Sequence, residues 1–383
     1  MEDKHMLMIP GPTPVPESVL LAMAKHPIGH RSGAFSEIMA EVTENLQWLF
    51  QTKNDVFCLA ASGTGAMEAG LINFLSPNDK VLVGTNGKFG DRWAIICETY
   101  GMDVERIEAP WGQPLDPAVF KAKLEADTNK EIKGVVVTHS ETSTGVLNDL
   151  ETISGYVKAH GALMIVDSVT SMGSCNVPVD EWGLDVVATG SQKGFMLPPG
   201  LGFVSVSDKA WEAYETATIP RFYLDLKAAK KSLAKNTTPF TPPVNLIFGL
   251  QTALQMMKRE GLQEIFARHE RLTEATRAAI KALGLKTFAP DSNASKAVTS
   301  VDPSPIGAED IRKAMRTQFD IALAGGQDDY KGKIFRIGHL GFVHERDVMT
   351  AVAALEATLQ GLGHTGFEAG AGLKAAASVF QKS

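Results

Sequence analysis

The chain has 383 residues, of which 44% are hydrophobic and 21% are charged, and its formal net charge is −7. This composition is typical of a globular protein with a large core, and the acidic balance argues against a nucleic-acid binder. The sequence shows neither the apolar region of a secretory signal nor a run of about 18 apolar residues that could cross a membrane.

The N-terminal segment is predicted to be an extended arm. Residues 9–16 contain four prolines, which remove backbone donors and prevent a helix. We expect this arm to cross other parts of the structure. A short helix over residues 17–25 and a longer amphipathic helix over residues 35–50 follow.

From residue 56 onward, short apolar runs alternate with helical stretches. The predicted strands are residues 56–60, 81–84, 104–108, 134–138, 163–166 and 186–189. The predicted helices between them are residues 65–75, 90–100, 116–126 and 150–159. This alternation predicts a largely parallel α/β sheet with right-handed crossovers. Residues 202–206 follow after a loop too short for a crossover helix, so we expect them to form an antiparallel strand.

Beyond residue 262 the pattern changes to that of a smaller α+β unit. A charged helix over residues 262–283 leads into it, followed by strands at 297–301 and 333–337 and helices at 308–318 and 345–359. We therefore predict two domains: residues 1–262, with the arm and a large α/β domain, and residues 263–383, a small C-terminal domain. The Gly- and Ala-rich tail after Gly361 supports no prediction.

A Gly-rich turn follows the first strand of the predicted sheet. Residues 61–68 read Ala-Ser-Gly-Thr-Gly-Ala-Met-Glu and lead directly into a helix, whose first N–H groups could hold a phosphate. A tight turn that binds no ligand explains these residues equally well. A dinucleotide-binding turn requires a small residue where Glu68 stands, which argues against a nicotinamide oxidoreductase.

Two further polar residues follow strands of this sheet. Asp167 ends an apolar run, where a carboxylate is costly unless it is paired. Its partner could be the protonated pyridine nitrogen of pyridoxal phosphate, or Asp167 could be a structural cap. Lys193 lies among small residues and, if desolvated, would have the lowered pKa of a Schiff-base nucleophile. Because ligands of open α/β sheets bind at the carboxyl ends of the strands, we expect both residues at one edge.

Five segments, in this order, resemble those of the class V, fold-type I pyridoxal-phosphate aminotransferases. They are residues 138–146, 166–169, 190–193, 198–200 and 335–338. The chain is particularly similar to the alanine–glyoxylate, serine–glyoxylate and serine–pyruvate group, from Pro10 to about residue 360. The resemblance implies a mainly parallel seven-stranded sheet in the large domain and a smaller α+β domain. It also implies pyridoxal 5'-phosphate as cofactor and a homodimer with shared active sites.

The resemblance implies roles for the residues around the cofactor ring. Lys193 would carry the cofactor as a Schiff base and transfer the proton, and Asp167 would pair with the pyridine nitrogen. Val169 would pack on one face of the ring. Phe89 would stack on the other face, where many relatives have Trp.

The resemblance also implies the polar contacts of the cofactor and substrate. Gly63, Thr64 and Gln192 would hold the phosphate, and the Thr142 hydroxyl would reach the phenolic oxygen at the substrate side of the ring. Arg336 would bind the substrate carboxylate through a bidentate fork.

A segment after residue 235 matches one that reaches the partner subunit. Thr241 would contact the partner's phosphate, whereas Thr238 stands where some relatives have Tyr, and its contact is left open. His30 and His139 receive no chemical role, and no metal site is predicted.

The implied reaction is a ping-pong transfer of an amino group from alanine or serine to glyoxylate or pyruvate. Arg336 is the single cation that the sequence identifies for a substrate carboxylate, which favours small substrates. The scaffold also serves phosphonate aminotransferases and carbon–sulfur lyases. A non-catalytic accessory subunit could keep the fold, but we would then expect Lys193, Asp167 or Arg336 to be lost, and all three are present.

The three cysteines form no CxxC pair, so neither a zinc site nor a disulfide framework is indicated. This favours a reducing, cytoplasmic setting. Cys58 and Cys97 fall in a predicted strand and helix and are interpreted as core residues. Cys175 lies in a loop after Asp167, so a desulfurase-like role for it remains open.

Overall fold

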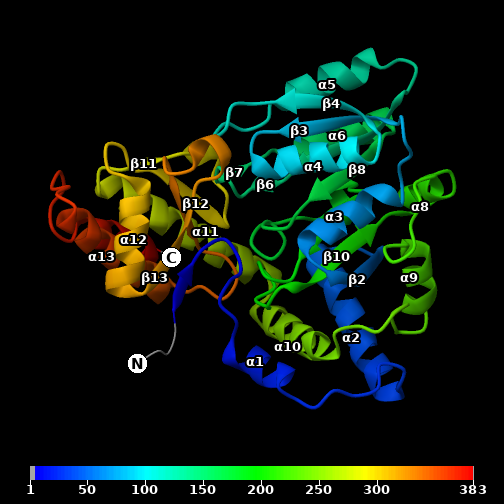
Figure 1. The fold of residues 1–383 in the computed structure, drawn as a ribbon, viewed down its shortest axis with the longest axis horizontal. Coiled ribbons are helices and arrows are strands. Elements are labelled where there is room, and N and C mark those ends of the chain that lie inside the picture. Colours follow the sequence, from blue (N-terminus) through cyan, green and yellow to red (C-terminus); the bar gives the residue numbers. More distant parts are fainter. Residues whose placement is uncertain (1–4, 383) are drawn as a thin grey trace.

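The computed structural model describes residues 5–382 and contains a larger and a smaller β-sheet, each with its own helices (Figure 1). The larger sheet has seven strands in the order β2-β10-β9-β8-β5-β3-β4. Their bounds are β2 Asp55–Ala61, β3 Lys80–Thr85, β4 Asp103–Glu108, β5 Ile132–Thr138, β8 Leu163–Asp167, β9 Val186–Gly190 and β10 Gly200–Val206. Only β10 runs antiparallel to its neighbours among these strands. The predicted seven-stranded, mainly parallel sheet is therefore confirmed.

Helices pack on both faces of the larger sheet. Their bounds are α1 Glu17–Met23, α2 Gly33–Phe50, α3 Gly63–Ile72, α4 Lys88–Thr99, α5 Pro117–Ala126, α6 Leu150–His160, α7 Val179–Trp182, α8 Asp208–Tyr214, α9 Leu226–Leu233 and α10 Val244–Glu260. Successive residues of β5 enter opposite cores, because side chains alternate along a strand. Val135 and Val137 belong to the core cluster that includes residues of α2, α5 and α6, whereas Val136 belongs to the cluster that includes residues of α3 and α4. This explains the continuous apolar runs of the central strands.

The smaller sheet has five strands in the order β1-β13-β14-β12-β11. Their bounds are β1 Met6–Met8, β11 Lys286–Thr287, β12 Val298–Asp302, β13 Ile321–Gly325 and β14 Phe335–Gly338. Helices α11 Leu262–Ala282, α12 Ala308–Phe319, α13 Glu345–Gly361 and α14 Ala371–Phe380 accompany it. A short hairpin of β6 Ser140–Glu141 and β7 Val146–Leu147 completes the strands described. In residues 5–382, no helix is both long and apolar enough to span a bilayer.

The N-terminal arm belongs to both parts of the molecule. It begins as β1, which pairs with β13 of the smaller sheet, and then passes along the larger part (Figure 1). The Thr13 backbone N–H donates to the Gln192 carbonyl, and the Thr13 hydroxyl donates to the Lys193 carbonyl at 3.0 Å. The expected extended arm therefore passes beside Lys193. The domain boundary at residue 262 stays a prediction.

Gly338, at the end of β14, lets the arm approach the smaller sheet. A Cβ at this position would lie 2.2 Å from the Ile9 carbonyl carbon and 2.5 Å from the Pro10 nitrogen. We therefore expect Gly338→Ala to overpack this contact and to lower the free energy of unfolding by about 1–3 kcal/mol. Urea denaturation of the variant measures this change.

Gly155→Ala is the matched control for that substitution. Gly155 lies within α6, and nothing stands within 4 Å of the Cβ that alanine would add. Since alanine favours a helix over glycine, we expect this variant to be at least as stable as the parent. A Gly338→Ala variant as stable as Gly155→Ala would contradict the packing argument.

Candidate active site

A cavity of about 220 Å³ opens at the carboxyl edge of the larger sheet. Eight residues singled out in the sequence line it: Gly63, Thr64, Phe89, Thr142, Asp167, Val169, Gln192 and Lys193. They come from the segments that follow β2, β3, β5, β8 and β9. Carboxyl ends of parallel strands meet at one edge, which is why residues so far apart in the chain converge here.

Lys193 presents a nucleophilic amine to this cavity. Its Nζ donates a hydrogen bond to the Pro10 carbonyl at 2.7 Å, and a Cβ on Gly11 would lie only 2.4 Å from that nitrogen. Desolvation, with smaller contributions from the positive charges of Arg336 and Arg92, lowers the pKa of Lys193 to about 8, although the charge of Asp167 opposes the shift. Roughly a tenth of the amine is therefore neutral at pH 7, far more than for an ordinary lysine.

Asp167 lies at the end of β8, where it is buried. One carboxylate oxygen accepts from the Val169 backbone N–H at 2.8 Å, and the other accepts from the Trp93 indole N–H at 3.0 Å. Desolvation raises the pKa of Asp167, although these two donors oppose the change. The carboxylate is thus fixed in direction, and a cationic ligand in the cavity would stabilise its charged form.

Two apolar side chains and the start of α3 form the remaining surfaces of the cavity. Phe89, from α4, and Val169 both line it. A Cβ on Gly63 would lie 3.1 Å from a Val169 methyl, so this turn leaves little room for a larger residue. Ser62 is the N-cap of α3, but its side chain does not cap the helix, which leaves the first N–H groups for a ligand. The Gln192 Oε1 atom is buried and has no partner within the described part of the chain.

Arg92 also lines the cavity, although it was not among the residues predicted for the site. Its guanidinium lies 4.9 Å from the centre of the Phe89 ring and 3.4 Å from the Thr64 hydroxyl. Arg92 is thus a cation of this cavity in addition to the predicted Arg336, and the assignment of Arg336 as the single anchor for a substrate carboxylate stays a prediction. The position of Arg92 three residues after Phe89 on a predicted helix was the available signal, since such residues share a face.

Arg336, from the smaller sheet, does not itself line the cavity but contacts Thr142, which does. It is buried in β14, where its Nε donates to the Gly325 carbonyl at 2.9 Å and its Nη1 donates to the Thr142 carbonyl at 3.1 Å. Desolvation lowers the pKa of Arg336 to about 10, and the charge of Glu141 opposes this shift. The side chain therefore stays cationic next to Thr142, whose hydroxyl lies 3.0 Å from that of Thr170.

The predicted partner-contacting segment lies away from this cavity. Thr241 is exposed and borders a separate small pocket together with Thr238. The Thr238 hydroxyl donates to the Phe240 carbonyl at 2.7 Å. His30 uses its carbonyl to accept from Thr237, and neither His30 nor His139 lines the main cavity. Burial lowers the pKa of His139 to about 4, so it is neutral.

The three cysteines are poor candidates for a catalytic thiol. Burial raises the pKa of Cys58 and of Cys97 to about 12, and that of Cys175 to about 11. Thiolates, rather than thiols, are the nucleophiles in cysteine chemistry. Cys175 is buried and does not line the main cavity, so its position does not favour a desulfurase-like role.

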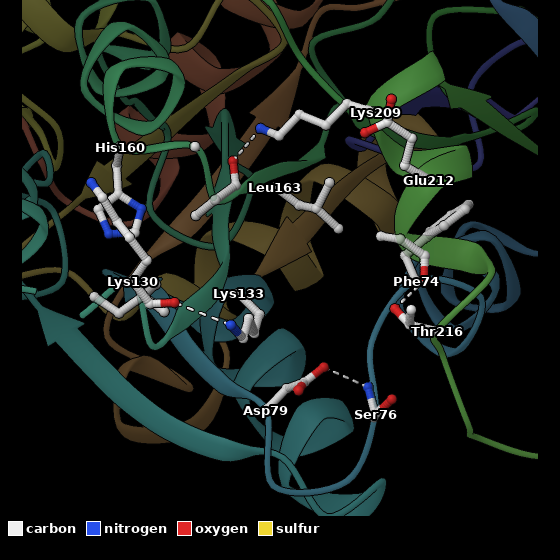
Figure 2. Close-up of a pocket in the computed structure, with 14 residues that line it drawn as sticks. Phe74, Ser76, Asp79, Lys130, Lys133, His160, Leu163, Lys209, Glu212 and Thr216 are labelled. Carbon is white, nitrogen blue, oxygen red and sulfur yellow. Dashed lines mark hydrogen bonds between the residues drawn. The ribbon is translucent and has the colours of Figure 1, made fainter. Parts of the chain in front are cut away.

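A larger cavity of about 610 Å³ lies at the opposite edge of the sheet (Figure 2). Its lining includes residues near the amino ends of β3, β5 and β8. The polar groups there serve the local backbone: Asp79 accepts from the Ser76 N–H, and the Lys133 amine donates to the Lys130 carbonyl. Because ligands of open α/β sheets bind at the carboxyl edge, the smaller cavity is the candidate active site.

Known proteins resemble the chain over its whole length. A "Soluble hydrogenase, small subunit" of Synechococcus is 66% identical over 99% of both chains. An L-aspartate–glyoxylate aminotransferase of Paracoccus denitrificans is 38% identical over 100% of this chain and 98% of its own length. A serine–glyoxylate aminotransferase of Methylorubrum extorquens is 37% identical over 99% of this chain and 97% of its own length.

The fold is similar to that of solved aminotransferases. The crystal structure of ureidoglycine–glyoxylate aminotransferase from Bacillus subtilis aligns with a TM-score of 0.92 at 33% identity, covering 100% of this chain and 99% of that one. The family model Aminotransferase class-V matches residues 6–331. The matching family and the shared fold show that this chain belongs to the class V aminotransferases, whose members depend on pyridoxal phosphate.

Proposed function

We propose that this aminotransferase passes the amino group of a small amino acid, serine or alanine, to glyoxylate or pyruvate by a ping-pong mechanism with pyridoxal phosphate. The observation that carries the proposal is the Lys193 amine, with a pKa of about 8, in one cavity with the buried carboxylate of Asp167. Relatives named for glyoxylate support the acceptor. The donor rests on the sequence resemblance and on the serine–glyoxylate relative.

The lining of the cavity fits pyridoxal phosphate. Phe89 and Val169 would hold a flat ring, and Asp167 would pair with a ring nitrogen cation. The open start of α3 at Gly63 and the neighbouring Arg92 would hold a phosphate. When bound, the cofactor supplies an electron sink for the negative charge that develops at the substrate α carbon.

The protein groups would bind the substrate and move its proton. Arg336 would orient the substrate carboxylate, since its Nε and Nη1 bonds to backbone carbonyls fix the guanidinium. The neutral Lys193 amine would remove the proton from the α carbon of the amino acid. In the second half-reaction it would return a proton to the α carbon of the 2-oxo acid. Asp167, fixed by the Trp93 indole, would keep its charge facing the cavity throughout.

The pKa of Lys193 predicts a pH dependence for cofactor uptake. A neutral amine is needed for attachment, so the rate at which cofactor-free protein takes up pyridoxal phosphate should rise with pH, with a midpoint near 8. An ordinary lysine would place that midpoint near 10.4. Stopped-flow absorbance across pH 6 to 11 would give the midpoint. A value above 10 would contradict the desolvated environment.

The visible absorbance spectrum tests the proposed function directly. The purified protein should show a yellow cofactor band that disappears when L-serine or L-alanine is added and returns with glyoxylate or pyruvate. L-Aspartate should be included, because one relative is named an L-aspartate–glyoxylate aminotransferase. A protein that stays colourless with added pyridoxal phosphate would contradict the proposal.

We further propose a homodimer in which the segment around Thr241 completes the partner's site. Phe222 is 80% exposed, and the centre of its ring lies 5.7 Å from that of Phe240, which belongs to the segment around Thr241. A large exposed aromatic side chain beside this segment favours an interface there. Light scattering of the purified protein should give twice the chain mass. A cytoplasmic location stays a prediction.

A second candidate function is that of a subunit in a larger complex. It rests on the 66% identical relative named as a soluble hydrogenase subunit. Lys193, Asp167 and Arg336 are all present and close to one cavity, which favours a working transaminase site. An active transaminase that is isolated without other subunits would contradict a purely accessory role.

A further inference from the structure

Glu141 is a fully buried carboxylate next to the candidate active site that the proposed reaction does not use. One of its oxygens accepts from the backbone N–H groups of Phe89 and Gly90, at 3.1 and 3.0 Å. The other accepts from the Ser143 N–H at 3.1 Å and from the Ser143 hydroxyl at 2.6 Å. All four contacts are donated to Glu141, which favours an ionised carboxylate, whereas desolvation by burial raises the pKa of Glu141.

The first pair of contacts fixes the start of α4. Its N-cap residue is Gly87, which has no side chain to satisfy the free N–H groups at the helix start. Glu141 reaches them from β6, and its negative charge also interacts favourably with the positive end of the helix dipole. A Cβ on Gly87 would lie 2.4 Å from Glu141 Cγ, so this approach requires glycine there. Glu141 thereby sets the position of Phe89, a wall of the cavity.

Glu141 also lies close to the predicted carboxylate anchor. Within residues 5–382, no carboxylate stands within 4 Å of the Arg336 guanidinium. Arg336 instead donates to the carbonyl of Thr142, the residue after Glu141. Glu141 is the negative charge that acts most strongly on Arg336. The charge of Glu141 therefore offsets part of the cost of burying the Arg336 guanidinium.

We propose that Glu141 is a positioning residue that holds the ring wall at Phe89 and the anchor Arg336 in one fixed arrangement. This inference rests on the proposed function of the same cavity. Glu141 does not touch the substrate; it acts through α4 and through the segment that carries Thr142. Its loss should therefore weaken both the binding of the cofactor and the binding of carboxylate substrates.

The test compares Glu141→Gln with Glu356→Gln. Glu356 is a matched control because it is also buried, at 6% exposure, and its two oxygens accept from the N–H groups of Gly370 and Gly372 at the start of α14. A glutamine at either site turns an NH₂ group toward backbone donors, so both variants should lose thermal stability. Only Glu141→Gln should weaken pyridoxal-phosphate binding, measured by titrating cofactor-free protein, and raise KM for donor and acceptor, each by about tenfold.

Glu141→Asp is a second test variant in case Glu141→Gln does not fold. The shorter side chain keeps the charge facing Arg336 but cannot span the same distance to α4. We expect weaker cofactor binding with KM values closer to those of the parent. Unchanged cofactor affinity and KM in Glu141→Gln or in Glu141→Asp would overturn the proposal. Failure of the proposed function would be distinct, since the parent protein itself would then neither bind the cofactor nor turn over.

Discussion

Replacing Lys193 with alanine should lower the turnover of transamination by about 1,000-fold or more, the scale expected when a positioned acid–base group is removed. The variant loses the only amine that lines the cavity, among the residues described. Its fold should persist, because the substitution removes a desolvated amine rather than a core side chain. The measurement is the steady-state rate with L-serine and glyoxylate, together with the melting temperature.

A covalent readout separates attachment from turnover. Borohydride reduction should fix pyridoxal phosphate to the parent protein and raise its mass, and it should leave the mass of Lys193→Ala unchanged. Lys209→Ala serves as the control, since Lys209 is a half-exposed lysine paired with Asp185 at 3.0 Å, far from the active-site cavity. Normal turnover in Lys193→Ala would show that the proposed mechanism is wrong.

The larger sheet could be predicted because each of its strands is defined by local sequence. Central strands are buried on both faces, so their sequences are short runs of Val, Ile and Leu between helices. Once those runs are ordered as β and α, chain topology alone brings Asp167 and Lys193 to the same edge. The close approach of these residues at one cavity was therefore accessible from sequence.

The supporting contacts of the site could not be predicted in the same way. Trp93 donates to Asp167, and Glu141 accepts from the start of α4, although the paired residues are 74 and 52 positions apart. Nothing local distinguishes a tryptophan that donates to a buried carboxylate from one that only fills the core. Such contacts depend on how α4 and the β6 hairpin dock, which periodicity does not specify.

The smaller part of the chain was predicted less completely for a related reason. β1 pairs with β13 across 315 residues, and neither segment carries a pattern that points to the other. α14 was missed because Gly- and Ala-rich sequence is equally compatible with a loop, and its packing against α11 decides the outcome. Thr241 cannot be assigned from a single chain, because its predicted contact lies in a partner subunit.

Replacing Arg336 with alanine should raise KM for both the amino acid and the 2-oxo acid by about 100-fold, as expected when one partner of a buried hydrogen-bonded charge pair is truncated. Both substrates carry the carboxylate that the guanidinium would bind, so both half-reactions should suffer equally. Arg336→Lys keeps a charge but loses the planar fork, and we expect an intermediate KM. Unchanged KM values in Arg336→Ala would remove this residue from the substrate site.

A rise in KM could also come from disorder around Thr142, because Arg336→Ala leaves the Thr142 carbonyl without its 3.1 Å donor. Two measurements separate the explanations. Guanidinium ion added to the variant should restore activity if the missing group is the charge. Reaction with a simple alkylamine, which has no carboxylate, should be equally slow in parent and variant if Arg336 acts only on the carboxylate. If the alkylamine reaction also fell 100-fold, Arg336 would be stabilising the Thr142 segment rather than binding substrate.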